Sequence, residues 1–116
     1  MKVNELFPDV MTEDTKFEYK AILNRENPVK WAKNIVAYAN DAGGYIFIGV
    51  SNERDAFGLD LRTIDETKNL IALVNNRFIF PHAKLSYMMR SVDEEAERFV
   101  LVVKVLPLTP YNGYMK

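Results

Sequence analysis

Five basic side chains occur close together in the first third of the chain, at spacings that suit contact with phosphates. Between residues 16 and 33, five positive charges face two negative ones, although the whole chain carries a net charge of −1. The five are Lys16, Lys20, Arg25, Lys30 and Lys33. Such a cluster can neutralise several phosphates and release their counterions. We therefore expect a nucleic-acid-binding face here; the alternative is an ordinary solvated surface.

Aromatic and further basic residues extend this expectation. Tyr19 or Tyr38, if exposed, could stack a nucleobase, because every base has a π face. Arg54, in a polar stretch, and Arg77, near the end of a helical pattern, are weaker additions to the basic set.

A glycine pair, Gly43-Gly44, follows Asn40 directly before an apolar run. Phosphate-binding loops place their glycines at a helix N-terminus, where free amides and the helix dipole favour anions. These glycines follow a helical pattern, at the opposite end, and the chain has no Walker-type motif. We expect a structural role: Gly43 ends the helix, Gly44 allows close packing, and Asn40 ties down the turn by local side-chain hydrogen bonds. The residues give no support to ATP binding.

Other chemistries have little support in the composition. The chain has no cysteine, which excludes disulfides and thiolate metal sites, and its one histidine, His82, has no partner ligand in any motif. No serine belongs to a recognisable catalytic triad. There is no signal peptide and no apolar run long enough to cross a membrane, so we expect a cytoplasmic protein with no membrane partner.

The first half of the chain predicts a strand, a helix and a second strand. Residues 16–23 alternate aromatic and charged side chains, which is typical of a strand with one wet face. Asn27 and Pro28 suit the cap and first position of a helix, and apolar residues then recur at helical spacing up to Gly43. In residues 45–50 the side chains that would point to either face of a strand are apolar, as in a central strand covered on both sides.

The second half predicts a helix and a hairpin. Thr63 and Glu66 fit a capping box, and Pro81 prevents the following helix from running further. Residues 85–92 and 98–106 read as two paired strands joined by an acidic turn. We therefore expect an α+β fold in which two helices pack on a four-stranded or larger mixed sheet, in the order β-α-β-α-β-β, after a loose arm or short leading helix over residues 1–15.

Several of these segments together resemble the Schlafen/Alba-like DNA-binding domain family. Residues 17–20, FEYK, resemble its E-F-K signature, and residues 36–50, VAYANDAGGYIFIGV, resemble its central A-F-A-N-x-x-G-G motif and the strand ending in G-V. Gly49 belongs to that strand, and Gly58 to the G-hydrophobic pair behind the next loop. Pro110-Tyr111 resembles the P-V-Y that follows the hairpin. The resemblance covers about 100 residues and makes Asn40, Gly43, Gly44, Gly49 and Gly58 the structural motif.

The resemblance implies binding of DNA or RNA as part of a regulator of transcription, and a homodimer as one assembly. Family members usually continue with a strand that carries an R-x-G motif, and often with a regulatory module. The resemblance therefore implies that residues 1–116 are one domain that is cut near its C-terminal end.

The resemblance also implies a metal site to be weighed. Schlafen ribonucleases hold a divalent metal with three carboxylates, two of them five residues apart, a spacing that Glu13 and Glu18 match. The third position falls on Asn52, which can coordinate through its carbonyl but brings no charge, and Asp55 could replace it only if the loop bends inward. This departure speaks against nuclease activity with Mg²⁺ or Mn²⁺.

The combined reading is a nucleic-acid-binding domain without a cofactor rather than a complete enzyme. Two alternatives stay open: a degenerate metal-dependent nuclease, and a protein-interaction or dimerisation module that uses an edge strand or the Trp31 face of the first helix.

Overall fold

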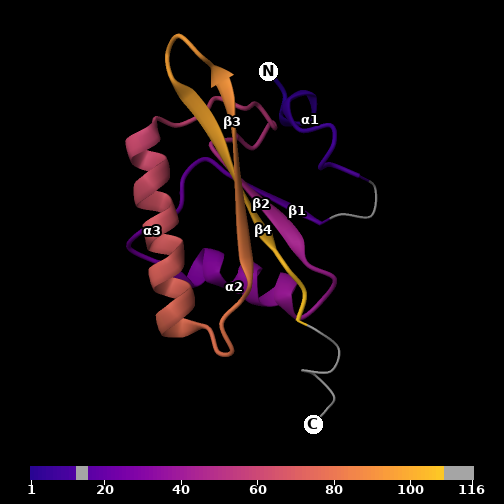
Figure 1. Cartoon of the computed structure of the whole chain (residues 1–116), viewed down its shortest axis with the longest axis vertical. Helices are drawn as coiled ribbons and strands as arrows, with labels where there is room; N and C mark the ends of the chain where they lie inside the picture. The colour runs from indigo at the N-terminus through magenta and orange to yellow at the C-terminus, as the bar shows by residue number, and fades with distance from the viewer. Residues whose placement is uncertain (13–15, 109–116) are drawn as a thin grey trace.

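The fold is a mixed sheet with its two long helices on one face (Figure 1). The computed structural model describes residues 1–12 and 16–108. In these residues the elements are α1 (Val3–Leu6), β1 (Phe17–Lys20), α2 (Val29–Ala39), β2 (Gly44–Ile48), α3 (Leu61–Phe78), β3 (Leu85–Asp93) and β4 (Arg98–Val105). The four strands lie in the order β1-β2-β4-β3, with β1 parallel to β2 and the other neighbours antiparallel. The predicted α+β fold and C-terminal hairpin are confirmed.

The first face of the sheet, which we call the helix face, is aliphatic and closed. Trp31 and Ile35 of α2 and Ile71 of α3 pack on it, each at most 2% exposed. The strands contribute alternate residues of β2 and β4: Ile46, Ile48, Leu101, Val103 and Val105. Burial of these side chains is the main source of stability for the fold.

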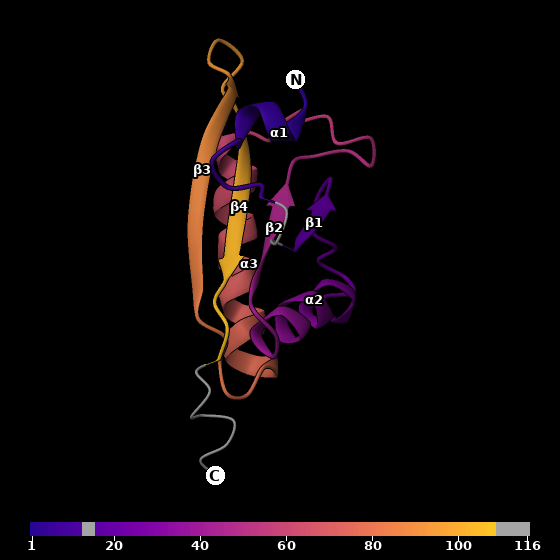
Figure 2. The same ribbon diagram turned by 90° about the vertical axis from the view of Figure 1, so that its right-hand side faces the viewer.

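The second face, the open face, is covered in part by the N-terminal segment (Figure 2). Val3 and Phe7 are fully buried against Phe47 and against Val100 and Val102 of β4. A loose arm was therefore the wrong alternative for residues 1–12, and the short leading helix is the one found. The physical reason is that the odd-numbered side chains of β2 need a cover, and the apolar side chains at positions 3, 7 and 10 supply it.

Backbone bonds hold this segment to the loop after β2. The amide of Val3 donates to the carbonyl of Arg54 at 2.8 Å, and the amide of Ala56 donates to the carbonyl of Met1 at 2.8 Å. The N-terminus is thus paired like a short extra strand with residues 54–56, which explains why it is ordered.

Two predicted helix starts are corrected. Helix α3 begins at Leu61, with Asp60 as its N-cap: the Asp60 carboxylate accepts from the Thr63 amide at 2.8 Å. Thr63 is therefore the residue that is capped, because a carboxylate three positions earlier reaches its amide. In α2, Pro28 already has helical dihedrals, and no side chain caps the helix; Asn27 contributes only its carbonyl, which accepts from the Lys30 amide at 3.3 Å.

Candidate nucleic-acid interface

Two lysines of the predicted basic set lie together on the outer side of α2. Lys30 and Lys33 are one turn apart, opposite the buried Trp31 and Ile35, and both are exposed. Neither forms an ion pair with a carboxylate in the part of the chain that the structure describes. Two unneutralised ammonium groups on one helix face can each contact a phosphate.

Lys20 lies on the same side of the molecule. Side chains alternate along β1, so Lys20 shares a face with Glu18, and Glu18 accepts from the Asn34 amide of α2 at 3.2 Å. Asn34 follows Lys30 by one helical turn, so β1 and the lysine side of α2 are neighbours. The structure thus brings Lys20, Lys30 and Lys33 to one side, and we call these three residues the lysine face.

The other two members of the basic set lie elsewhere. The Lys16 ammonium forms an ion pair and hydrogen bond with the carboxylate of Asp41, and this contact holds the pKa of Asp41 below its ordinary value. Arg25 sits beside α3, where it lines a hollow with Glu66 and Leu70. The sequence pattern could not show that Lys16 and Arg25 lie apart from the other three basic residues, because their positions depend on how the chain turns between β1 and α2.

The carboxylates that the resemblance implies are not assembled into a metal site in the described residues. Glu13 lies outside the described residues. Glu18 is held by Asn34, and Asn52 is exposed in the loop after β2. No group of three potential ligands that could hold a metal occurs among residues 1–12 and 16–108. A metal site with Mg²⁺ or Mn²⁺ stays a prediction.

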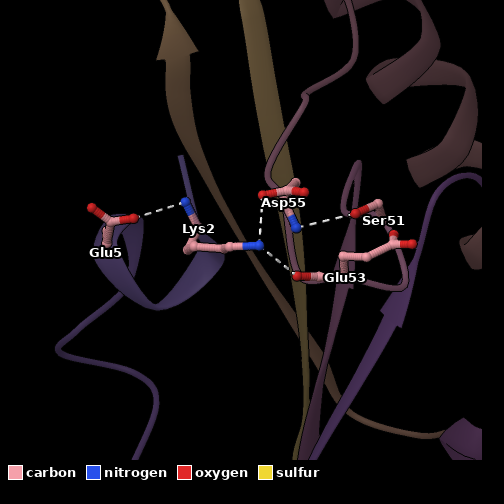
Figure 3. Close-up of polar contacts among 5 residues, drawn as sticks. All are labelled: Lys2, Glu5, Ser51, Glu53 and Asp55. Carbon is pink, nitrogen blue, oxygen red and sulfur yellow. Dashed lines mark hydrogen bonds and ion pairs between the residues drawn. The ribbon is translucent and has the colours of Figure 1, made fainter.

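Asp55, the possible substitute ligand, is part of a different contact (Figure 3). The Lys2 ammonium lies 2.9 Å from the Asp55 carboxylate and donates to the Glu53 carbonyl at 3.0 Å. The Asp55 amide donates to the Ser51 hydroxyl at 3.1 Å, and the Lys2 amide donates to the Glu5 carboxylate at 3.0 Å. The Asp55 carboxylate is therefore already paired with an ammonium group.

The glycine pair lies against the end of α2. Gly43 has a φ of +88°, and its amide donates to the Tyr38 carbonyl at 2.9 Å. A Cβ on Gly44 would lie 2.6 Å from the Tyr38 ring. Asn40 closes the helix with its backbone amide, which donates to the Val36 carbonyl at 3.0 Å. The Gly43 amide is thus committed to the helix end rather than free for a phosphate.

Gly49 and Gly58 bring the loop after β2 back against the sheet. Both have positive φ, +98° and +79°, and the Gly58 amide donates to the Gly49 carbonyl at 3.0 Å. A Cβ on Gly58 would lie 2.9 Å from the Cβ of Arg98. The two glycines therefore position the loop that carries Asn52 and Asp55.

The open face has a row of side chains that the sequence analysis did not assemble. In the strand register, Phe17 of β1 pairs with Tyr45 of β2, Tyr45 with Lys104 of β4, and Lys104 with Ser86 of β3. We call these four residues the open row. Phe17 and Tyr45 are half-buried, while Lys104 and Ser86 are exposed. The aromatic residues at alternate positions of residues 17–19 and 45–47 were the signal for this row, but only the register places them side by side.

Cations lie over both ends of the aromatic cluster on this face. The Phe17 and Tyr45 rings stack with centroids 6.1 Å apart. The Lys104 ammonium lies 5.9 Å from the Tyr45 centroid, and the Arg54 guanidinium lies 5.6 Å from the Tyr19 centroid. These are cation–π distances. Tyr19 and Arg54, both suggested by the sequence, therefore belong to this face.

Tyr38, the other suggested stacking residue, has a packing role instead. Its ring lies against Gly44, and burial raises the pKa of its hydroxyl, with a smaller contribution from the charge of Glu18.

Comparison with known proteins identifies the family of the chain. The family model described as "Schlafen, AlbA_2" matches residues 13–112. The chain therefore belongs to the Schlafen AlbA_2 family, as its motifs predicted, and membership points to nucleic-acid or nucleotide binding as the class of function. The match begins beyond the described N-terminal segment, so the cover of the open face lies outside it.

One curated relative shares part of the chain. An uncharacterized ATP-binding protein, UU034, of Ureaplasma parvum serovar 3 is 32% identical over an alignment of 69 residues, and the match covers 57% of this chain and 19% of that protein. The aligned part of this chain thus corresponds to about a fifth of the relative's length.

Within the described residues, no helix is both long and apolar enough to cross a membrane.

Proposed function

We propose that this domain binds nucleic acid through the lysine face, within a cytoplasmic regulator of transcription. The observation that carries the proposal is the pair of exposed lysines on α2, Lys30 and Lys33, which lack carboxylate partners in the described residues. The net charge of −1 gives no general attraction for polyanions, so binding depends on this local excess. Family membership supports the same class of ligand.

Catalysis and ATP binding have weaker support. Asn52 stands at the third carboxylate position, and Glu18 is already bonded to Asn34. The name of the Ureaplasma protein indicates ATP binding for that protein. Phosphates bind free amides at helix N-termini, whereas the Gly43 and Gly58 amides of the present chain already donate to the carbonyls of Tyr38 and Gly49.

The proposal is tested by charge reversal. The variant carrying Lys20→Glu, Lys30→Glu and Lys33→Glu is titrated into labelled single-stranded DNA, duplex DNA and structured RNA, and fluorescence anisotropy is measured at two salt concentrations, with and without Mn²⁺. The matched control carries Lys68→Glu, Lys84→Glu and Arg98→Glu. These substitutions change the net charge by the same amount but lie toward the β3 side of the molecule, opposite the lysine face.

The lysine-face variant is expected to lose roughly tenfold or more in affinity, and its salt dependence should fall by about one counterion per lost contact. The control should keep most of its affinity. Equal losses in both variants would show that only net charge matters and would contradict the proposal. Shortening of the RNA in Mn²⁺ would instead support the nuclease alternative.

An apolar patch favours a second candidate, self-association. Val29 and Val36 of α2 lie beside the end of α3, and Phe78 and Phe80 are 68% and 74% exposed. Large exposed apolar patches often mark protein interfaces. The Trp31 face is not available for this purpose, because Trp31 is 2% exposed and its indole donates to the Asn24 carbonyl at 2.8 Å.

We propose a homodimer through this patch. Sedimentation velocity should then show a dimer that Phe78→Ser and Phe80→Ser convert to monomer. A wild-type monomer at all concentrations would exclude it.

A further inference from the structure

We propose that the open row stacks the bases of a single-stranded nucleic acid, with Tyr45 as the main stacking ring and Lys104 as the phosphate contact. The proposal rests on the proposed function and adds the form of the ligand and a second contact surface, on the face of the sheet opposite α2.

The N-terminal segment leaves the open row uncovered. In the next row along the strands, Phe47 and Val102 are at most 1% exposed and pack with Val3 and Phe7. In the open row itself, by contrast, Tyr45 is only half-buried and Lys104 is exposed. The N-terminal segment therefore covers only part of the open face, and the Tyr45 side chain next to it remains in contact with solvent.

The chemistry of the open row fits bases joined by phosphates. An aromatic side chain on a sheet offers a flat surface for a base, and stacking does not depend on base identity. Lys104, directly across from Tyr45 in the register, is placed for the phosphate that follows a stacked base. A duplex keeps its bases inside the helix and cannot use such a surface, so the geometry selects a single strand.

A hollow beside Tyr45 extends the surface. It has a volume of about 210 Å³ and is lined by Tyr45, Lys104 and Lys16 together with the glycine pair. Lys16 is paired with Asp41 in the free domain, so a phosphate here would compete with that exposed ion pair, which contributes little stability. The hollow therefore brings two lysines close to Tyr45: Lys104, which has no carboxylate partner in the described residues, and Lys16, which is paired with Asp41.

The aromatic cluster also packs the open face, so its presence alone does not establish binding. The open row adds an exposed cation over Tyr45 that is bonded to no carboxylate in the described residues. A ring in contact with an exposed ammonium can exchange that cation–π contact for a stacked base while the lysine moves to the phosphate.

The test uses oligonucleotides of about ten nucleotides, as DNA and as RNA, each containing the fluorescent base 2-aminopurine, with the corresponding duplexes for comparison. Stacking on an aromatic ring quenches this base. The variants are Tyr45→Leu, Tyr45→Phe and Lys104→Gln. A matched control is available across the sheet: the Lys68 ammonium lies 5.6 Å from the Tyr87 centroid, so Tyr87→Leu removes a similar ring from the other face.

The wild-type domain should bind single strands more tightly than duplexes and quench the probe. Tyr45→Leu should weaken single-strand binding by roughly 5- to 100-fold and abolish the quenching, because one base stack is lost. Tyr45→Phe should retain both, Lys104→Gln should weaken binding and its salt dependence, and Tyr87→Leu should change neither. The DNA and RNA arms then show which sugar is preferred.

The outcomes separate this proposal from the previous one. If Tyr45→Leu binds and quenches like the wild type while the lysine-face variant loses binding, the stacking surface is wrong and the proposed function stands. If the wild type binds duplexes as well as single strands, the open row is not the ligand site. If the wild type binds no nucleic acid at low salt, both proposals fail.

Discussion

The two faces of the sheet are covered in different ways. On the helix face, two helices close an aliphatic core around β2 and β4. On the open face, residues 1–12 cover Phe47 and Val102 through Val3 and Phe7. The aromatic and basic side chains of the open row stay half-buried or exposed beside this cover. Figure 2 shows α1 and α3 on opposite sides of the strands.

The difference separates stability from binding. The closed aliphatic core gains free energy from burial, and on that side the ligand contacts fall to the lysine face outside the core. A partly covered aromatic face gives less stability, and its rings and cations can change partners. The following predictions test this division in order of decreasing effect on stability.

Truncation on the helix face should have the largest effect. Trp31→Ala removes a side chain that is 2% exposed together with its bond to the Asn24 carbonyl. We expect the free energy of unfolding to fall by about 3–5 kcal/mol. Urea denaturation followed by circular dichroism measures this loss, and a loss below about 1 kcal/mol would contradict the assignment of Trp31 to the core.

Truncation of the cover should cost less. Phe7 is fully buried, and its ring meets Phe47 edge-on at 5.3 Å. Phe7→Ala should lower the free energy of unfolding by about 2–3 kcal/mol, because the segment can detach while the helix face stays closed. Amide hydrogen exchange should then rise in residues 1–12 and not in α3; a rise throughout the sheet would show that the two faces are not independent.

The cover should also respond to acid. Arg90 holds Asp9 with two bonds of 2.6 Å and donates to the Leu6 carbonyl at 2.9 Å. Its hydrogen bond lowers the pKa of Asp9 from the ordinary value of 3.8. Because the pKa of Asp9 is lower in the folded than in the unfolded state, its ionised form stabilises the fold at pH values above the unfolded pKa. This stabilisation is lost as the pH falls through the folded pKa.

Asp9→Asn should therefore be slightly less stable than the wild type at pH 7, and the difference should disappear as pH falls below 3.8. Urea midpoints from pH 7 downward measure it. The effect is small because Asp9 is exposed. A constant difference at all pH values would contradict the ion pair.

Substitution in the open row should have the smallest effect on stability. Tyr45→Leu keeps an apolar side chain at a half-buried position, so we expect a change within about 1 kcal/mol. Thermal melting checks this, with Tyr45→Phe as the conservative control. A large loss would show that Tyr45 is needed for packing and would weaken its assignment to a ligand.

The strands and helices were predictable from the sequence because their signals are local. The apolar run of residues 45–50 and the helical spacing before Gly43 both predicted elements that the structure confirms. The start of α3 was misplaced because Thr63 and Asp60 are both good caps and only the structure shows which one accepts the bond. The leading segment could not be placed because its partners, Phe47 and Val102, are distant in the sequence.

The candidate site was predictable only in part. Lys30 and Lys33 share a helix face by spacing alone, but the Lys16–Asp41 pair and the position of Arg25 beside α3 depend on how the chain turns. The open row was missed because Tyr45 and Lys104 meet only through the pairing of β2 with β4, across nearly sixty residues.

The most direct test of nucleic-acid binding is a titration of the ¹⁵N-labelled wild-type domain with a single-stranded oligonucleotide, followed by amide chemical shifts. The account predicts shifts in two sets of residues, the lysine face with Lys20, Lys30 and Lys33, and the open row with Tyr45 and Lys104. It predicts little change in α3 and in the end of β3 next to the hairpin turn, residues 90–93. No shifts at low salt, or shifts confined to α3 and β3, would contradict it.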